Sequence, residues 1–393
     1  MDDVVILSAA RTPIGVFQGA LASLPAHALG ARAVAAAVER AGLIPGDVEQ
    51  VNLGCVLTAG QGQAPARQAA IAAGCPVSTG AITLNKVCGS GMRAMMIAAN
   101  DLRCGDYKVV VAGGMESMSQ GPYLAAGVRD GLRLGHGKLV DSVIHDGLWD
   151  PYNDLHMGNC AELCAAEYKF SREEQDAYSV ESYRRAREAA EKGLFAEEIV
   201  PVSIVGKKGT TVVDRDEEPF KVDLAKIGSL RPAFQKDGTV TAGNASKIND
   251  GAAALVLTTA AHAARLGRKP IARILAHTSL AQKPEWYSTA PIGAARAVLE
   301  RAGLKAADVD LWEVNEAFAV VAQAFLRDLD LPHDRVNVRG GAVALGHPIG
   351  ASGARIVVTL LHALRERGVR LGCAAICIGG GEATAILVER TEG

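Results

Sequence analysis

Residues 89–102 read GSGMRAMMIAANDL, and residues 350–364 read GASGARIVVTLLHAL. In both stretches Ser-Gly-x-Arg opens an apolar run long enough for a helix. Each run leads into an apolar segment that ends in glycines, YKVVVAGG at 107–114 and CAAICIGGG at 373–381. Self-similarity of this kind indicates internal duplication. We therefore predict two copies of one α/β unit.

A second repeat supports the first. ERAGLIPGDV at 39–48 recurs as ERAGLKAADV at 300–309, each time after an alanine-rich helical pattern and before a short strand. The strand-like runs are apolar on both faces, as is typical of strands between two layers of helices. Small residues in the Ser-Gly-x-Arg repeat would let two central helices approach closely. The sequence thus predicts an α/β fold with mixed or parallel sheets in a five-layer α-β-α-β-α body.

The segment between the copies, residues 120–245, does not repeat. Its clearest helix starts at a capping box formed by Ser171 and Glu174 and ends near Gly193. An insertion of this length is more often functional than idle, so we expect a lid or substrate-binding segment. The predicted domains are an N-terminal half at 1–119 completed by about 246–268, the loop domain at 120–245, and a C-terminal half at 269–393.

Composition narrows the classes of function. The 393 residues carry a formal net charge of −2 with acids and bases mixed along the chain, which argues against nucleic acid as a partner. Polar residues or glycine interrupt each apolar stretch before it reaches membrane-spanning length, and no basic-then-apolar leader precedes the first strand. We expect no membrane association, and a cytoplasmic location.

The eight cysteines are too sparse for a disulfide scaffold, so a reducing compartment is expected. Two pairs have C-x3-C spacing. Cys373 and Cys377 lie in a strand-like run, where four residues span roughly 13 Å, too far to share one ion. Cys160 and Cys164 could share a helix face, but no second pair accompanies them. We predict no metal site.

Cys88 directly precedes Gly89-Ser90-Gly91 at the start of the first repeated helix. A thiol at a helix N-terminus feels the partial positive charge of unpaired N–H groups, which lowers its pKa and favours the thiolate. The flanking glycines allow a ligand to approach closely. The alternative is a small buried hydrophobic residue, the commoner role of a free cysteine. The local pattern supports a nucleophile and a core residue about equally.

Three further elements carry polar or exposed backbone groups. His347 stands in GHPIG, at the position in the second copy that corresponds to the Cys88 turn. This position favours a functional role, although a lone histidine is usually structural. Asn315 opens NEAF after a strand-like run, where open α/β sheets place functional groups, but it could equally be a helix N-cap. Cys377 is followed by Gly379, Gly380 and Gly381, whose N–H groups could bind an oxyanion or phosphate. That loop matches neither a Walker loop nor a dinucleotide fingerprint.

Together and in this order, these elements resemble the thiolase family. The resemblance covers nearly the whole chain, and the motifs are long enough that chance agreement is negligible. VAGGMESMS, FQKDGTVTA and WEVNEAF are most similar to the biosynthetic or acetoacetyl-CoA branch. The matching motifs are SAARTPIG (8–15), NKVCGSGM (85–92), VAGGMESMS (111–119), HMG (156–158), DGTVTAGNAS (237–246), NDGAAA (249–254), NEAF (315–318), GGAVALGHPIGASGAR (340–355) and CIGGG (377–381).

The resemblance implies a thiolase fold and assigns roles to residues. Cys88 would be the acyl-accepting nucleophile and Cys377 the catalytic acid and base. His347 would activate Cys88 and donate to the thioester oxygen of the substrate, assisted by a water held on Asn315. The backbone N–H groups of Cys88 and Gly379 would form the other oxyanion hole.

The resemblance also implies the ligands. Coenzyme A would bind as a substrate along the loop domain, and no cofactor is expected. The implied partners are acetyl-CoA, acetoacetyl-CoA or another short 3-ketoacyl-CoA, together with three further copies of the chain in a homotetramer, a dimer of dimers. The implied contacts of coenzyme A are Ser246 beside the pantetheine arm, then Leu148, His156, Met157, Phe234, Ala317 and Phe318, with Lys221 as a loose counterpart of a basic residue near the adenine nucleotide.

The chemistry can be argued without the family. Making or breaking a carbon–carbon bond beside a thioester requires an enolate, whose parent acid is far weaker than a thiol of pKa about 8.5. A sulfur base can work only if the enolate oxygen is strongly stabilised where its charge develops. Covalent capture on a cysteine divides the transfer into two steps and predicts ping-pong kinetics. The reaction that the resemblance implies is the reversible Claisen condensation of two acetyl-CoA, the activity of an acetyl-CoA C-acetyltransferase.

Four other functions compete with this interpretation. The first is a 3-ketoacyl-CoA thiolase of broader chain-length range. A ketoacyl synthase would also use a cysteine at a helix start, but it expects histidines, or a histidine and an asparagine, as partners rather than a second cysteine. A non-catalytic acyl-CoA-binding relative would lack Cys88, His347 or Cys377. A cysteine hydrolase would leave the duplication unexplained.

The sequence departs from the family pattern in two places. Pro219 stands near the position where potassium-activated relatives carry a tyrosine, which puts a bound potassium in doubt. After CIGGG the chain has Glu382-Ala383 in place of the common Gly-Gln or Gly-Met, and the sequence alone gives this change no meaning.

Overall fold

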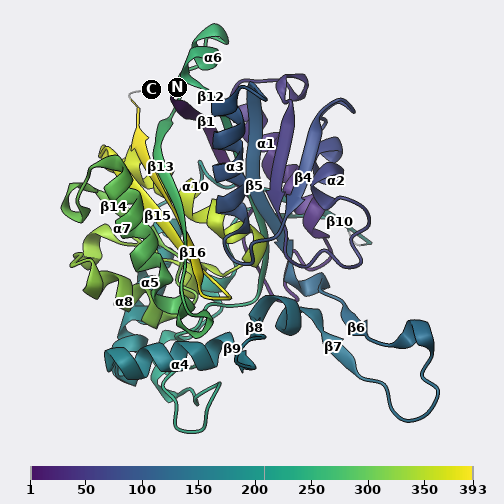
Figure 1. Cartoon of the computed structure of the whole chain (residues 1–393), viewed down its shortest axis with the longest axis vertical. Coiled ribbons are helices and arrows are strands. Elements are labelled where there is room, and N and C mark those ends of the chain that lie inside the picture. The colour runs from purple at the N-terminus through teal and green to yellow at the C-terminus, as the bar shows by residue number, and fades with distance from the viewer. Residues whose placement is uncertain (1, 208, 392–393) are drawn as a thin grey trace.

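The two copies of the repeat form two halves of one body, each with a mixed sheet (Figure 1). The computed structural model describes residues 2–207 and 209–391. Three neighbouring strands run parallel in the first half and two in the second, and antiparallel strands continue each half sheet. The strands of the first half are β1 (Val4–Arg11), β2 (Gly15–Val16), β3 (Gln50–Gly54), β4 (Gly80–Leu84), β5 (Val109–Ser117) and β12 (Asn249–Thr259), and those of the second are β13 (Ala272–Ala281), β14 (Leu311–Val314), β15 (Leu371–Ile378) and β16 (Glu382–Arg390).

The two half sheets are joined at one point. β1 pairs antiparallel with β13 at Val5 with Arg273 and Ile6 with Ala272, and this pairing makes one continuous ten-stranded sheet. The repeats do not predict this connection, because it depends on contacts between residues more than 260 positions apart. Strand β12 lies between β1 and β5, so a strand that follows the 120–245 segment is part of the first half sheet.

The helices form three layers around the two half sheets. α3 and α10 pack on each other between the half sheets, and each contacts strands of both halves. The outer helices cover the remaining faces. The outer layers are α1 (Ala26–Arg40) and α2 (Pro65–Ala72) on the first half, and α7 (Ala290–Ala302) and α8 (Ala319–Asp328) on the second; the central layer is α3 (Ser90–Cys104) and α10 (Ile349–Arg367), and α6 (Ala260–Arg265) lies beside β1 and β12.

The two central helices cross at the repeated glycines, which confirms the predicted close approach. A Cβ atom added to Gly91 would lie 2.8 Å from the backbone nitrogen of Ala354, and one added to Gly353 would lie 2.6 Å from that of Met92. Both distances are too short for a real side chain. A larger residue at either glycine would therefore push the helices apart directly behind the turns that precede them.

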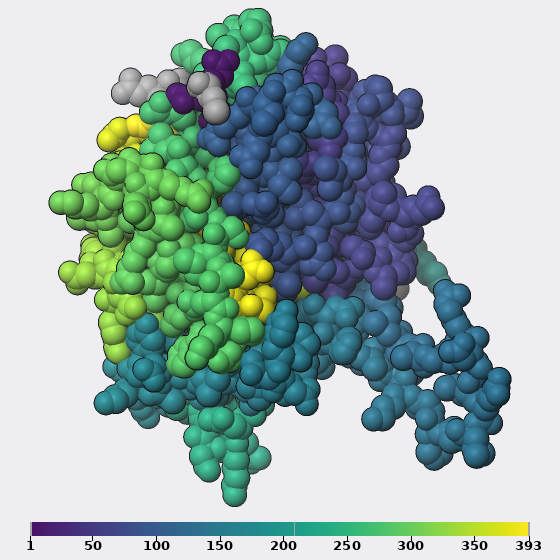
Figure 2. Space-filling model, viewed as in Figure 1, coloured from purple at the N-terminus to yellow at the C-terminus, as the bar shows by residue number. Residues whose placement is uncertain are grey.

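The 120–245 segment forms an arm, two helices and a hairpin. The arm, β6 (Tyr123–Ala125) and β7 (Leu139–Asp141) with the loop between them, projects from the body (Figures 1 and 2). The capping box is confirmed, because the Ser171 hydroxyl accepts from the Glu174 N–H at 3.1 Å and the Glu174 carboxylate accepts from the Ser171 N–H at 2.7 Å. The other elements are β8 (Trp149–Asp150), β9 (Leu155–His156), α4 (Met157–Tyr168), α5 (Arg172–Glu191), β10 (Val202–Gly206) and β11 (Gly209–Val213), with α9 (Ala342–Leu345) packed on α5 from the second half.

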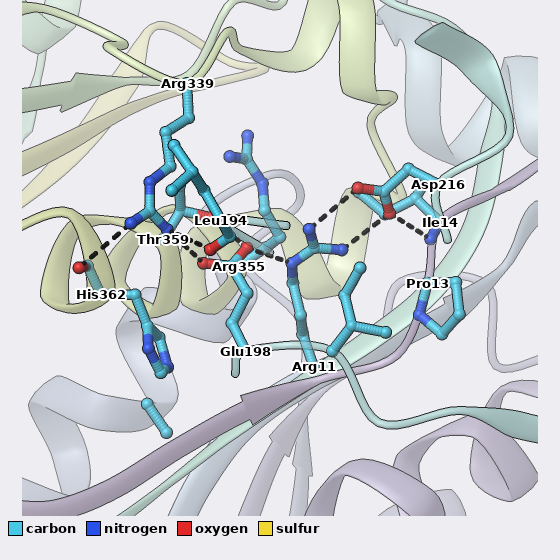
Figure 3. A network of polar contacts seen from close by, with 12 residues as sticks. Arg11, Pro13, Ile14, Leu194, Glu198, Asp216, Arg339, Arg355, Thr359 and His362 are labelled. Atoms are coloured by element: carbon cyan, nitrogen blue, oxygen red, sulfur yellow. Dashed lines mark hydrogen bonds and ion pairs between the residues drawn. The ribbon is translucent and has the colours of Figure 1, made fainter. Parts of the chain in front are cut away.

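A buried ionic network ties this segment to both halves (Figure 3). Arg11 at the end of β1 donates to Glu198 at 2.6 Å and to both carboxylate oxygens of Asp216 at 2.7 and 2.9 Å. Glu198 also accepts from Thr359 on α10 at 3.1 Å. Buried charges persist only when paired and hydrogen-bonded, as these are. The network thus fixes the position of the 120–245 segment relative to the central helices.

Candidate active site

Cys88 lies in a tight turn between β4 and α3. Val87, the residue before it, has a φ of +45°, which a β-branched residue adopts only where the surrounding structure enforces it. Ser90 supplies part of that enforcement, because its hydroxyl donates to the Val87 carbonyl at 2.6 Å and accepts from the Lys86 N–H at 2.8 Å. The sequence therefore holds the thiol on a strained turn at the first residues of the helix.

The Cys88 sulfur faces two backbone donors. Its own N–H and that of Gly379 both interact with it and favour the thiolate, but burial has the larger effect and raises the pKa of Cys88 to about 11. The thiol is thus protonated at neutral pH and needs a base to become a nucleophile. The same two N–H groups are those predicted to form an oxyanion hole.

His347 is the base that the geometry offers. Its Nδ1 lies 2.6 Å from the Ser352 hydroxyl oxygen, and that hydroxyl donates its only proton to the Pro348 carbonyl at 2.9 Å. His347 must therefore donate from Nδ1, which leaves Nε2 as the acceptor. Burial, assisted by the charge of Arg355, lowers the pKa of His347 to about 3, so the ring is neutral.

Asn315 lies beside this acceptor nitrogen. Its amide nitrogen is 3.5 Å from His347 Nε2, and its amide oxygen has no protein partner among the residues that the structure describes. α8 begins at Ala319 with Phe318 as its N-cap, so the alternative of Asn315 as a helix cap is wrong. An unpartnered buried amide oxygen beside a neutral imidazole is a suitable place for a bound water.

The backbone around His347 is held from the first half of the molecule. The His347 N–H donates to the Asn249 side chain at 2.9 Å, and the Gly350 N–H donates to Glu116 at 2.9 Å. Glu116 also accepts from the Val56 and Leu57 N–H groups at 2.9 and 3.2 Å. These contacts set the position of the histidine relative to Cys88.

Cys377 stands at the end of β15, immediately before the glycine loop. Burial raises its pKa well above the usual value, and a charge on Cys88 raises it further. The Ala317 N–H acts in the opposite direction by favouring the thiolate. Gly379, two residues after Cys377, directs its N–H to the Cys88 sulfur, so this end of β15 lies at the Cys88 turn. Gly380 and Gly381 have φ values of +89° and +82°, which glycine adopts without strain and which turn the loop so that Gly379 faces Cys88.

One pocket of about 320 Å³ joins most of the predicted site. His156 stacks on Phe234 with ring centroids 4.8 Å apart, and Phe318 meets Phe234 edge to face at 5.9 Å. The pocket wall is largely apolar, as ligand sites commonly are. The residues predicted from the sequence that line it are Cys88, Leu148, His156, Met157, Phe234, Ser246, Ala317, Phe318, His347 and Gly379.

Three predicted residues do not line this pocket. Cys377 and Asn315 are fully buried beside it, next to Cys88 and His347 respectively. Lys221 is exposed and lies in a separate hollow with Arg215 and Glu217, so the structure does not bring it to the pocket. The reason is the short helical turn Glu218–Phe220, whose buried Glu218 accepts from Tyr183 at 3.4 Å and leaves the following lysine on the solvent side.

Sequence reasoning missed several residues that shape the site. Ser352 fixes the His347 tautomer. Its place in the repeated Ser-Gly-x-Arg motif is the feature of the sequence from which a role for it could have been predicted. Tyr287, which lines the pocket and donates to the Met157 carbonyl at 3.0 Å, stands in a stretch without a motif. Glu382 forms an ion pair with Lys86, which links the glycine loop of one half to the Cys88 turn of the other.

No three His, Cys, Asp or Glu side chains gather as a metal site would require within residues 2–207 and 209–391. In the same part of the chain, no helix has both the length and the apolar character to cross a membrane.

The pocket brings together a thiol, Cys88, and a neutral histidine, His347, from two duplicated halves, with a second thiol, Cys377, buried beside it. The family models "Thiolase, N-terminal domain" and "Thiolase, C-terminal domain" match residues 4–261 and 268–390. The chain belongs to the thiolase family.

Named relatives agree across the full length. The chain is 51% identical to acetyl-CoA acetyltransferase of Pseudomonas aeruginosa, covering 99% of this chain and 100% of the relative. It is 53% identical to the mitochondrial acetyl-CoA acetyltransferase B of Xenopus laevis, covering 99% and 92%. The crystal structure of the Bacillus anthracis acetyl-CoA acetyltransferase superimposes with a TM-score of 0.97 at 42% identity, covering 100% of this chain and 99% of that one.

Proposed function

We propose that the chain is an acetyl-CoA C-acetyltransferase that condenses two acetyl-CoA to acetoacetyl-CoA and free CoA, and catalyses the reverse thiolysis. One observation carries the proposal: Cys88 and His347, from the two halves, line one apolar pocket, and the Cys377 thiol is buried beside it. The names of the full-length relatives support the same reaction.

The first step of thiolysis uses the resting tautomer of His347. Nε2 takes the proton of Cys88 as the sulfur attacks the 3-keto carbon of acetoacetyl-CoA. The N–H groups of Cys88 and Gly379, which face the sulfur in the free enzyme, are placed to receive the oxyanion that forms on the attacked carbonyl. His347, now with a proton on Nε2, donates to the thioester oxygen of the departing acetyl-CoA enolate.

The second thiol completes the carbon–carbon cleavage. The enolate carbon takes the proton of Cys377, and acetyl-CoA leaves while the acetyl group stays on Cys88 as a thioester. The buried environment favours the protonated form of Cys377, so the proton is available when the enolate forms. Incoming CoA gives its thiol proton to Cys377, and its sulfur attacks the carbonyl of the Cys88 thioester. The second acetyl-CoA forms as the Cys88 thiolate leaves and takes back the proton held on His347 Nε2. Condensation is the reverse sequence.

The pocket predicts a preference for short acyl chains. Phe234, Phe318 and Met157 narrow it beside the reactive groups. We expect CoA-dependent cleavage of acetoacetyl-CoA with a kcat/KM about tenfold or more above that of longer or branched 3-ketoacyl-CoA substrates, since extra methylenes that do not fit change binding by that order. Measured rates across such a series test this. A flat profile up to long chains would instead favour a broad-range 3-ketoacyl-CoA thiolase.

The proposed enzyme is a homotetramer, a dimer of dimers. Supporting this, the arm projects from the body (Figure 2) and carries exposed apolar side chains. Leu134 is 99% exposed and Leu139 72%. Such an arm is costly in water without a partner surface. We expect light scattering to give four chains per particle, and two chains after residues 125–138 are replaced by a short Gly-Ser turn. A monomer at micromolar concentration would contradict the proposal.

A cytoplasmic location and a role in fatty acid metabolism complete the proposal. All eight cysteines are free, and only Cys104 is exposed, which suits a reducing compartment. Fractionation of the source cells followed by the thiolase assay checks the location.

A further inference from the structure

Lys247 is one of the residues that line the active-site pocket, and main-chain carbonyl groups hold its ammonium. It follows Ser246, whose N–H donates to the Ala317 carbonyl at 3.0 Å. The Lys247 Nζ donates to the Ala245 carbonyl at 2.7 Å and contacts that of Val343 at 3.5 Å. Lysine is rarely held in such a place unless its charge is satisfied.

The charge of Lys247 is stabilised by carbonyl oxygens and an aromatic ring rather than by an ion pair. No carboxylate lies within ion-pair distance of Lys247 in the described part of the chain, although Glu218 and Glu316 act on it at longer range. The Tyr183 ring lies under the ammonium, with its centroid 5.7 Å from Nζ, which suits a cation–π contact. Burial lowers the pKa of Lys247 to about 8.

Neither Glu218 nor Glu316 is available for a closer ion pair with Lys247. Glu316 already accepts from Tyr178, Ser182 and Asn337, each at 2.8 Å, and from the Val343 N–H at 3.1 Å. Glu218 is buried against Tyr183. The surroundings thus consist of two carbonyl oxygens, an aromatic face and distant negative charge; backbone carbonyl oxygens can replace the water around a potassium ion, and an aromatic face attracts a cation.

The ammonium joins two segments that must keep their relative position. Ala245 bridges to Phe318 and precedes Ser246, on the side where the pantetheine arm is expected. Val343 belongs to α9, four residues before His347. The Lys247 side chain is therefore a direct link between the substrate-binding loop and the segment that carries the histidine.

We propose that the Lys247 ammonium takes the place of a bound monovalent cation in this carbonyl site and holds the Ser246 loop against the His347 segment, as a positioning residue. The effect of Lys247 on catalysis rests on the proposed thiolase function. Its effect on the structure of the carbonyl site does not depend on that function. A chain with this built-in charge has no need of added potassium, in agreement with the doubt that Pro219 raises.

The decisive experiment compares salts and variants. Acetoacetyl-CoA cleavage and the thermal midpoint are measured in KCl, LiCl and tetramethylammonium chloride at equal ionic strength. The wild-type enzyme should change less than about twofold, because its cation is covalently attached. Lys247→Ala should lose about tenfold or more in kcat/KM, the order of one lost charge-assisted hydrogen bond, and KCl should restore part of it and raise the midpoint.

Two matched variants sharpen the comparison. Lys247→Met keeps an unbranched side chain that fills the space, so its loss should persist in every salt. Lys192→Met removes an exposed lysine that pairs with Glu188 on α5 and should behave as wild type.

Several outcomes would overturn the proposal: activation of the wild-type enzyme by potassium of more than about fivefold, full activity of Lys247→Ala without potassium, or a Lys247→Ala midpoint that is the same in all three salts. If Lys247→Ala cannot be purified in any salt, the response of the wild-type activity and midpoint to the three salts tests the proposal. The midpoint measurement remains valid even if the chain cleaves no acetoacetyl-CoA, so failure of the thiolase proposal is distinguishable from failure of this one.

Discussion

Replacing Cys88 with alanine is expected to abolish both condensation and thiolysis, with kcat falling by about four orders of magnitude or more. The variant has no atom on which the acyl group can be held, and His347 then has no proton to remove. Steady-state rates with acetoacetyl-CoA and CoA measure the loss. Intact-mass spectrometry after incubation with acetoacetyl-CoA should show an acetyl adduct on the wild-type protein and none on the variant.

The chain offers a matched control for this experiment. Cys104 lies at the other end of the same helix and is exposed, so Cys104→Ala should keep wild-type activity and still form the adduct. An acetyl adduct that persists in Cys88→Ala would place the nucleophile elsewhere and contradict the assignment.

Replacing Cys377 with alanine should separate the two half-reactions. Without the second thiol, no group protonates the enolate in cleavage or removes the proton in condensation, and we expect turnover to fall by about 10² to 10⁴. Acylation of Cys88 by acetyl-CoA uses Cys377 only to protonate the departing CoA, whose thiolate can also leave and take its proton from solvent, so some labelling of Cys88 should remain. Rapid-quench labelling combined with steady-state rates makes the comparison.

Cys373 provides the control for this second prediction. It is a buried thiol on β15, four residues before Cys377, and it has no place in the proposed chemistry. Cys373→Ala should therefore lose some stability through a small cavity but retain turnover. Retained turnover in Cys377→Ala, or equal losses in the two variants, would refute the role of Cys377.

The parts of the structure that repeat could be predicted from the sequence. The Ser-Gly-x-Arg copies predicted two α/β halves and the close crossing at Gly91 and Gly353. Helices whose backbones touch need glycine at the contact, and glycine can be recognised in the sequence. The capping box at Ser171 is equally local and was also predicted correctly. For the site, long motifs placed Cys88, His347 and Gly379, and the structure brings all three to one pocket.

What the sequence did not predict depends on where side chains point across the fold. The pairing of β1 with β13, the ion pair of Lys86 with Glu382 and the reach of Lys247 to the Val343 carbonyl each join residues far apart in the chain. Lys221 shows the opposite error: a basic residue in the expected region of the sequence is directed away by the turn that Glu218 anchors. In both cases the position of a residue in the sequence does not predict which groups its side chain contacts in the fold.

The duplication has an electrostatic consequence for the pocket. α3 and α10 both begin at its wall, next to Cys88 and Ile349, and each helix start contributes about half a positive charge from its free N–H groups. No acidic side chain among the described residues lines the wall; behind it, Glu116 accepts from the Gly350 N–H and offsets part of the contribution of α10. Thiolates, oxyanions and enolates thus enter a field generated by the main chain, which no exchange of a side chain at the wall can remove.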